Sequence, residues 1–557
     1  MNEKLYDNII FNTCIKFAGS ESFSFAPMIF KSKYSDIDIP GVGVYQYGTS
    51  NPNGIPDDKA ILIDGLTDKK VTFGELKSNS KKLAAGLQTI GFKRGDVDYH
   101  AVVFGAIAAG GIVSPANPLY KVGELTFQLI DSGASIIFAH PNYLSTVVKA
   151  AEEANIPKSK IFLFEEEEVD GFQPYCSLIG DHVIEPVSYT PEEARMTTAF
   201  LCYSSGTVGK PKGVETTHTN IVANVAQLAA VKDSGTEDIF MGVLPFFHIY
   251  ELNLLVFLTV IVGGSTIVIP KFDIEKFCYC IEKYKINYAH VAPPIVLSLA
   301  KNPAIKRYNI SSLRMLISAA APLGKESSKE FSKILKIPIK QGYGLTEMSP
   351  ATHLCSSDNI VTFHIHNNSI GSIGCLLPNV EAKLVSVEGL KLGPNEGEIC
   401  VRGPNVMKGY LNNDEATKAS FDEDGFFHTE DIARVDENNR VKELIKYMGY
   451  QVAPAELEAI LLTYPAIADA AVIGCHSERS LTEYPTAYVV TKPGHKQTRE
   501  LKSDIQKHIS EKVVPHKKLR GGIYFTDQIP KSPTGKILRR ILREKLKKEF
   551  VDPLDKQ

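Results

Sequence analysis

Residues 203–213, YSSGTVGKPKG, combine glycines, hydroxyl side chains and lysines directly after the apolar run AFLC. Successive backbone N–H groups in such a turn form a concave nest for phosphate oxygens, and glycine permits close approach. A Walker A loop would open directly into a helix, whereas here Pro211 and the β-like run GVETTH follow. We therefore expect strand, loop and strand, with a helix beginning at Thr219. Taken alone, the stretch fits a phosphate loop or a mobile hairpin.

Further motifs follow in a fixed order: QGYGLTE (341–347), GEICVRGP (397–404), HTEDI (428–432), RVKELIKYMGYQVAPAELE (440–458) and IPKSPTGKILRR (529–540). Together with the loop at 203–213, they resemble the adenylate-forming acyl-CoA synthetases, or AMP-binding enzymes, a superfamily that includes beetle luciferase and peptide-synthetase adenylation domains. Through LPFFHIY (244–250), SPANPLY (114–120) and KLRGGIYF (518–525), the chain most resembles plant-type 4-coumarate–CoA ligases. The resemblance covers almost the whole chain.

The resemblance implies a reaction in two halves. A carboxylate attacks the α-phosphate of ATP, giving an acyl-adenylate and pyrophosphate, and the thiol of coenzyme A then displaces AMP. ATP, Mg²⁺ and coenzyme A are the expected cofactors, with 4-coumarate or a related hydroxycinnamate as the acid. A fatty-acyl or luciferase-like adenylating enzyme remains an alternative, as does a catalytically impaired paralogue that still binds nucleotide or acyl groups.

The resemblance also assigns the nucleotide and coenzyme A contacts. Glu347 corresponds to the Mg²⁺ ligand, Asp431 to the residue that accepts hydrogen bonds from the ribose, and Tyr343 to the residue beside adenine. The full set of cofactor-binding residues is Ser204, Ser205, Gly206, Thr207, Val208, Gly209, Lys210, Lys212, Ala320, Gln341, Gly342, Tyr343, Gly344, Thr346, Asp431, Arg440, Gly449 and Tyr450.

Four residues correspond to catalytic positions. Lys536 resembles the lysine that bridges the substrate carboxylate and the α-phosphate, and a protonated amine suits two oxyanions. His248 resembles the histidine that orients the adenylate, while Lys446 and Gln451 belong to the face presented for thioester formation. The acyl pocket is expected to include Tyr250, Leu254, Gly344, Pro350 and Ala351.

The chain departs from the family pattern at several points. Val208 replaces a threonine, Ala319 and Glu430 replace glycines, and Met448 replaces a lysine. Two gaps, after Val97 and after Asn439, each remove about one strand of ~5–6 residues. Loss of a buried strand would destabilise the large domain, and loss of the second strand would affect the hinge between domains.

Alternating helical and β-rich segments predict an α/β fold. A large N-terminal domain (1–438), with mostly parallel sheets flanked by helices and a small β-rich subdomain, precedes a small mobile α+β domain (439–557). We expect a helix over 71–91 and strands at SIIFA, KIFLF and NYAHV. Residues 254–270 are expected to form a buried helix, a glycine turn and a strand rather than a membrane span.

Composition narrows the classes of function further. The 557 residues carry a formal net charge of -3, which argues against a nucleic-acid binder because such proteins show clustered positive charge. The nine cysteines are scattered and are expected to be reduced thiols. No secretory signal or C-terminal peroxisomal tripeptide is visible, so we expect a cytoplasmic monomer whose partners are small molecules, without nucleic-acid partners or a transmembrane span.

Overall fold

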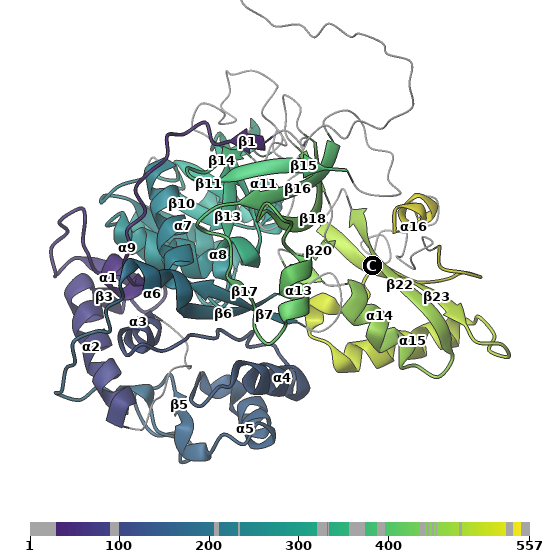
Figure 1. Cartoon of the computed structure of the whole chain (residues 1–557), viewed down its shortest axis with the longest axis horizontal. Helices are drawn as coiled ribbons and strands as arrows, with labels where there is room; N and C mark the ends of the chain where they lie inside the picture. The colour runs from purple at the N-terminus through teal and green to yellow at the C-terminus, as the bar shows by residue number, and fades with distance from the viewer. Residues whose placement is uncertain are drawn as a thin grey trace, which may run out of the picture.

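The structure is a computed structural model. It describes residues 29–89, 100–204, 211–231, 234–319, 331, 333–355, 374–386, 396–434, 440–442, 445–447, 450–452, 454–477, 482–530 and 539–546. Figure 1 shows a large body built around several sheets and a smaller body, formed by the last elements of the chain, standing to one side.

A nine-stranded sheet forms the centre of the large body, in the order β14-β13-β12-β11-β10-β8-β9-β2-β3. The six strands from β12 to β2 are parallel to one another, and β13, β14 and β3 are antiparallel at the two edges. The strands are β2 Ala60–Asp64, β3 Lys70–Thr72, β8 Ile239–Gly242, β9 Ser265–Val268, β10 Tyr288–Val291, β11 Met315–Ser318, β12 Ile339–Gly344, β13 Ala351–Leu354 and β14 Cys375–Leu376. The expected mostly parallel sheet is confirmed.

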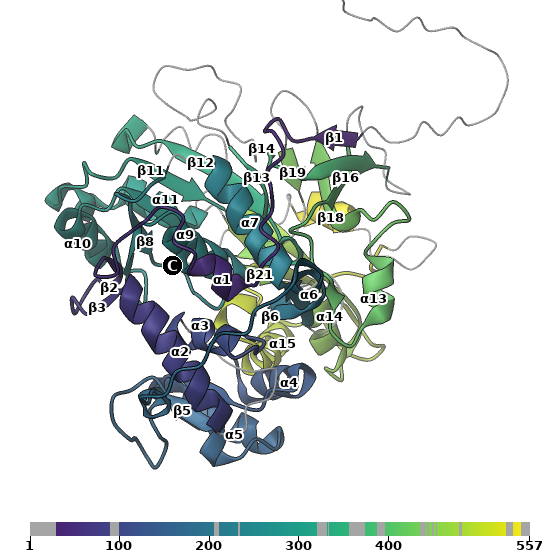
Figure 2. The same ribbon diagram turned by 60° about the vertical axis from the view of Figure 1, so that its left-hand side comes forward.

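Helices and hydrophobic clusters cover both faces of this sheet. Phe240, Tyr288 and Ile317 join one cluster, whereas their sequence neighbours Met241, Ala289 and Leu316 join the other, as the two-residue period of a strand requires. The helices are α1 Val44–Gly48, α2 Phe73–Thr89, α3 His100–Ala108, α7 His218–Val231, α8 Ile249–Glu251, α9 Thr259–Ile261, α10 Ile274–Tyr284 and α11 Pro293–Lys301. Figure 2 shows α2 and α3 side by side, near α1.

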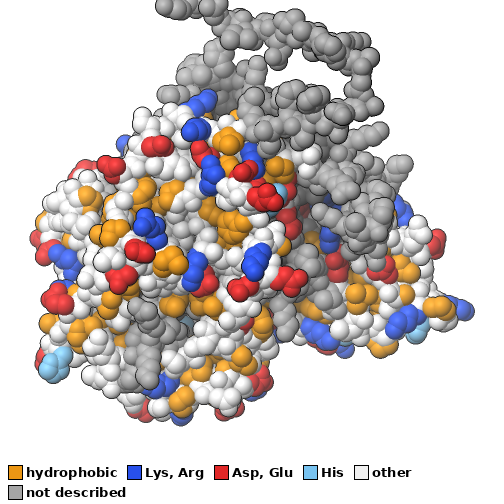
Figure 3. Space-filling view, viewed as in Figure 1, with side chains coloured by type: hydrophobic (Ala, Val, Ile, Leu, Met, Phe, Trp, Pro, Cys, Tyr) orange, Lys and Arg blue, Asp and Glu red, His pale blue; other side chains and the backbone are white. Residues whose placement is uncertain are grey.

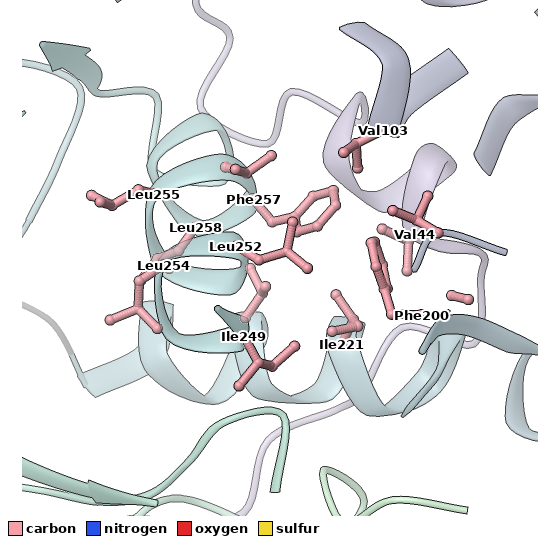
Figure 4. Packing of buried hydrophobic residues seen from close by; sticks show 14 of the residues in the cluster. Val44, Val103, Phe200, Ile221, Ile249, Leu252, Leu254, Leu255, Phe257 and Leu258 are labelled. Atoms are coloured by element: carbon pink, nitrogen blue, oxygen red, sulfur yellow. The ribbon is translucent and has the colours of Figure 1, made fainter. Parts of the chain in front are cut away.

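The apolar segment 254–270 is buried in this core. Residues Leu252–Leu258 form a π-helix, η4, that continues into α9, and a turn at Gly263 and Gly264 leads into β9. Leu252 and Phe257 point from η4 towards Phe200, Ile221 and Val103 (Figure 4). The predicted helix, glycine turn and strand are confirmed, and no helix among the described residues is long and apolar enough to cross a membrane.

A smaller sheet carries the glycine-rich stretch. β6 (Thr198–Ser204) pairs antiparallel with β7 (Lys212–Thr217), and β7 pairs with β17 (Gly409–Tyr410). The arrangement of strand, loop and strand is confirmed. The next helix, α7, begins at His218 rather than at Thr219, because the Thr217 hydroxyl accepts from Asn220 N and the Asn220 side chain accepts from Thr217 N.

The first gap in the family pattern falls beside α3. Residues 90–99 lie outside the described part of the chain, and α3 begins at His100. Among the described residues, β4 (Ile137–Ala139) pairs with β5 (Ile161–Leu163) alone, while Val113 makes an isolated parallel bridge to Phe200 of β6. Helices α4 Val122–Ser132, α5 Leu144–Glu153 and α6 Pro191–Met196, with the short helices η1 Pro141–Tyr143, η2 Lys158–Lys160 and η3 Tyr175–Leu178, complete this region.

An antiparallel five-stranded sheet forms the β-rich subdomain, in the order β1-β15-β16-β18-β19. Its strands are β1 Ile29–Lys31, β15 Glu381–Val385, β16 Glu396–Arg402, β18 Phe427–Arg434 and β19 Arg440–Lys442, and α13 Asp414–Ala419 precedes β18. β19 pairs with β18 directly after the second gap, with Arg440 opposite Arg434. Residues that follow the gap therefore serve as the edge strand of this sheet.

The last elements form the smaller body. β22 (Ile467–Ser477), β23 (Thr482–Thr491) and β24 (Gly522–Phe525) make a sheet, with α14 Pro454–Leu462 and α15 Arg499–Lys512 on one face and α16 Arg539–Leu546 on the other. A hairpin of β20 (Ile445–Tyr447) and β21 (Tyr450–Val452) precedes it. The short helices elsewhere are η5 Pro303–Arg307, η6 Thr346–Met348 and η8 Pro515–Lys517. Acidic and basic side chains are interspersed on the face shown in Figure 3.

Candidate active site

Glu347 is a buried carboxylate held by two hydroxyl groups. It lies in η6, is 7% exposed, and its Oε1 accepts from Ser204 Oγ at 2.8 Å and from the Tyr410 hydroxyl at 3.1 Å. Burial and the charge of Glu347 raise the pKa of Tyr410, so that this hydroxyl remains a donor. Both hydrogen bonds that the described residues make to this carboxylate go to Oε1, which leaves Oε2 for a cation. A carboxylate that shares a hard cation with phosphate oxygens is typical of Mg²⁺ sites, so these residues fit the ion.

Two strands and one short helix bring this cluster together. Ser204 ends β6, Tyr410 lies in β17, and Met407 N donates to Glu347 O at 2.8 Å, which ties η6 to the chain before β17. Lys212 Nζ lies 4.4 Å from the centre of the Tyr410 ring, within the range of a cation–π contact. The start of the glycine-rich stretch, its end and the carboxylate are therefore joined through Tyr410, a residue that the motifs do not indicate.

Asp431 forms a second buried carboxylate site. It is 1% exposed in β18; the Tyr343 hydroxyl donates to its Oδ2 at 2.8 Å, and its own N–H donates to Thr429 Oγ1 at 3.1 Å. Burial, followed by the charge of Asp431, raises the pKa of Tyr343 well above its ordinary value. Tyr343 is therefore a neutral donor that fixes the direction of the Asp431 carboxylate.

Glu430, directly before Asp431, adopts a backbone conformation that favours glycine. Its φ is +57°, and its N–H donates to Glu398 Oε1 at 2.8 Å. Glu398 Oε2 also lies 3.0 Å from His428 Nδ1, and this contact raises the pKa of His428. The family pattern has glycine at this position, and the left-handed backbone gives the physical reason.

We expect Glu430→Gly to stabilise the protein. A side chain in the left-handed region costs ~1–2 kcal/mol, and the greater freedom of glycine in the unfolded chain offsets ~0.5–1 kcal/mol of that gain. The free energy of unfolding from denaturant titration should rise by about 1 kcal/mol. Glu430→Ala is the matched control, because it removes the charge and keeps the Cβ. An equal gain from both variants would contradict the backbone explanation.

An open cavity lies beside these residues. His248 lines it from directly before α8, Tyr250 from α8 and Leu254 from η4. Tyr343, Gly344, Thr346, Pro350 and Ala351 line it from the chain around η6. Its other lining residues are Leu228, Ile249, Ile317, Ala319, Gly342, Leu345, His353 and Leu354. Gly344 is needed for close approach, since a Cβ there would meet Pro350 O at 1.8 Å. One cavity thus contains residues predicted for the nucleotide and residues predicted for the acyl group.

His248 is the N-cap residue of α8. Its Nδ1 accepts from Tyr250 N at 3.4 Å and caps the helix. Glu251 Oε2 lies 3.8 Å from the same nitrogen. Glu251 is 3% exposed, and burial raises its pKa well above the ordinary value. His248 is partly exposed and lines the cavity, so the histidine of the FFHIY motif is a cavity residue rather than a core residue.

A network of buried amides supports the cavity wall from behind. Asn253 Nδ2 donates to Ser349 O at 2.6 Å, Asn224 Nδ2 to Ala351 O at 2.7 Å, and Asn405 Nδ2 to Met348 O at 2.9 Å. All three side chains are fully buried. They fix the carbonyl groups of Met348, Ser349 and Ala351 and thereby the wall around Pro350. The sequence analysis missed them, because single asparagines on apolar helices and loops form no motif.

The remaining predicted residues fall into two groups. The first group lies in described strands: Gln341 and Gly342 in β12, Arg440 in β19, Lys446 in β20, and Tyr450 and Gln451 in β21. In the hairpin of β20 and β21, Lys446 pairs with Gln451. The predicted residues outside the described part of the chain are Ser205, Gly206, Thr207, Val208, Gly209, Lys210, Ala320, Gly449 and Lys536.

Comparison with known proteins places this geometry in context. The sequence model of the AMP-binding enzymes matches residues 50–411, and that of their C-terminal domain matches residues 456–536. The chain is 36% identical to 4-coumarate-CoA ligase 1 of Narcissus pseudonarcissus, over 94% of this chain and 97% of the relative. It is 38% identical to 4-coumarate–CoA ligase CCL1 of Humulus lupulus, over 93% and 96%.

Solved structures show the same architecture. The o-succinylbenzoate CoA synthetase of Bacillus subtilis aligns with a TM-score of 0.73 at 25% identity, over 90% of this chain and 98% of that chain. The amide bond synthetase McbA of Marinactinospora thermotolerans aligns with a TM-score of 0.74 at 20% identity, over 90% and 99%. The second likeness concerns the fold alone.

Proposed function

Because this chain belongs to the AMP-binding enzyme family, we propose that it is an ATP-dependent acid–CoA ligase acting on 4-coumarate or a related hydroxycinnamate. One observation carries the proposal: a single cavity is lined by Tyr343 and Thr346 on the nucleotide side and by Tyr250, Leu254 and Pro350 on the acyl side. A carboxylate and an α-phosphate can meet only where the two sites adjoin. The relatives named as 4-coumarate–CoA ligases support the choice of acid.

In the first half-reaction, a carboxylate oxygen of the acid forms a bond to the α-phosphorus, and the bond to the β-phosphate oxygen breaks. Pyrophosphate leaves with that electron pair. The chain must bind and neutralise the departing phosphates, a role for the loop 204–213. Lys536 would neutralise the substrate carboxylate and the α-phosphate as they approach each other. Glu347 would hold Mg²⁺, which supplies neutralisation of phosphate charge. Asp431, oriented by Tyr343, would accept hydrogen bonds from the ribose hydroxyls.

In the second half-reaction, the thiol sulfur of coenzyme A attacks the acyl carbon and loses its proton to solvent. AMP departs with the oxygen that had belonged to the acid. Residues 1–438 and 439–557 form the two units that move relative to each other between the halves. The family matches at 50–411 and 456–536 lie on opposite sides of this boundary, and the Lys446–Gln451 hairpin lies just beyond it.

The experiment follows AMP, pyrophosphate and thioester after mixing the protein with ATP, Mg²⁺ and a panel of aromatic and fatty acids, with and without coenzyme A. We expect pyrophosphate with hydroxycinnamates, and thioester and AMP in equal amounts only when coenzyme A is present. Pyrophosphate without thioester would favour an adenylating enzyme of another type. No pyrophosphate from folded protein with any acid would indicate a paralogue that has lost catalysis.

A further inference from the structure

Tyr250 and His290 form a buried hydrogen-bonded pair at the wall of the cavity. The Tyr250 hydroxyl lies 3.1 Å from His290 Nδ1, and the two rings meet edge to face with their centres 5.7 Å apart. Tyr250 is 8% exposed and His290 1%. Burying an imidazole is unfavourable unless it has polar partners, so this pair is a defined polar point in the protein interior.

The sheet places His290 on the cavity side. His290 lies in β10, in register with Ile317 of the parallel strand β11. Residues in register on neighbouring strands project from the same face of a sheet, and Ile317 lines the cavity. Tyr250 comes from α8 on the same side and is itself a lining residue. His290 therefore lies behind Tyr250 as seen from the cavity, and its hydrogen bond fixes the direction of the Tyr250 hydroxyl.

The pair leaves one hydrogen-bonding function for a bound molecule. A phenol hydroxyl has one donor and two acceptor positions. If Tyr250 donates to Nδ1, its oxygen can still accept; if Nδ1–H donates to the oxygen, the Tyr250 O–H can still donate. His290 is the one partner recorded for this hydroxyl among the described residues. The neighbouring wall is apolar at Leu254, Ile317 and Leu354.

We propose that His290 is a specificity-determining positioning residue, which directs the Tyr250 hydroxyl to bind a free hydroxyl group on the acid. A hydroxyl both donates and accepts and therefore fits either state of the pair. A methyl ether only accepts, and an unsubstituted ring does neither. This inference rests on the proposed ligase function and assigns the residue pair that distinguishes a hydroxycinnamate from acids without a free hydroxyl.

The test compares kcat/KM for 4-hydroxycinnamate, 4-methoxycinnamate and cinnamate. The wild-type enzyme should prefer the hydroxyl acid by about tenfold or more, the effect of one good hydrogen bond. Tyr250→Phe and His290→Leu should reduce this preference to within ~threefold, mainly by raising KM for the hydroxyl acid. His290→Asn, which keeps a polar atom at the place of Nδ1, should retain more of the preference than His290→Leu.

A purely structural role would give a different pattern. Equal losses for all three acids in His290→Leu, with the wild-type preference unchanged, would overturn the proposal while leaving the ligase function intact. Should His290→Leu fail to fold, Tyr250→Phe decides, because it removes a single oxygen; an unchanged preference in that variant also overturns the proposal. Absence of thioester with every acid in the wild-type protein would instead reject the ligase function itself.

Discussion

Glu347→Gln is expected to reduce acyl-adenylate formation by about 10²- to 10³-fold, the effect of removing one group that stabilises charge developing at the reacting phosphates. The amide keeps the volume and can still accept from Ser204 Oγ and the Tyr410 hydroxyl, which now meet at Oε1. It no longer offers a negative oxygen to Mg²⁺. Pyrophosphate release at saturating ATP and acid, measured across a magnesium titration, checks the effect.

The matched control is Glu215→Gln. Glu215 lies on β7, in the same sheet as Ser204, and pairs with Lys408 at 3.0 Å. It makes no recorded contact with Ser204 or Tyr410 among the described residues. This control should retain pyrophosphate release within ~threefold, since partly exposed ion pairs contribute little. A Glu347→Gln variant that unfolds at the wild-type denaturant concentration and releases pyrophosphate at the control's rate would contradict the assignment.

Lys536→Ala is expected to separate the two half-reactions. Adenylation should fall by about 10²- to 10³-fold, because the ammonium group is proposed to neutralise two oxyanions as they approach. Thioester formation from a supplied acyl-adenylate should remain within ~threefold of the wild type. The two rates are measured as pyrophosphate release and as thioester absorbance in single turnovers.

Lys545→Ala is the control for that experiment. Lys545 belongs to α16, shortly after Lys536, and is exposed with a hydrogen bond to Thr526 Oγ1. Its removal changes the charge of the same basic segment without touching the proposed lysine, so both half-reactions should continue. An equal loss of both half-reactions in Lys536→Ala would show that this lysine acts on folding or on domain placement instead.

Much of the fold could be predicted from local patterns. The strands SIIFA, KIFLF and NYAHV and the helix α2 were predicted because their periodicity is strong and their ends carry turn residues. The start of α7 was predicted at Thr219, whereas the helix begins at His218. Several threonines could have served as its cap, and the reciprocal bond between Thr217 and Asn220 decides among them. Element boundaries depend on such side-chain contacts.

The site was predicted where motifs are contiguous and missed where they are not. Ser204, Tyr343, Glu347 and Asp431 were all named from sequence, and the structure joins them in pairs through hydrogen bonds. Tyr410 was missed, because a tyrosine on a two-residue strand carries no periodic signal. His290 was missed for a related reason: on a fully buried strand, the sequence does not reveal which of its neighbours will be polar.

The second predicted gap lies directly before β19. Residues Arg440–Lys442, which follow this predicted gap, pair with β18 as β19. An edge strand keeps the backbone of β18 hydrogen-bonded, since buried N–H and C=O groups require partners. The rates of adenylation and of thioester formation, measured separately, test the predicted effect of this gap on domain movement.

The most direct test of the account is to supply the acid with both carboxylate oxygens labelled with ¹⁸O, together with ATP, Mg²⁺ and coenzyme A. If the acid attacks the α-phosphate and the thiol then displaces AMP, mass spectrometry should find one labelled oxygen in AMP and one in the thioester. Unlabelled AMP, or ADP in place of AMP, would contradict the adenylate mechanism proposed for this chain.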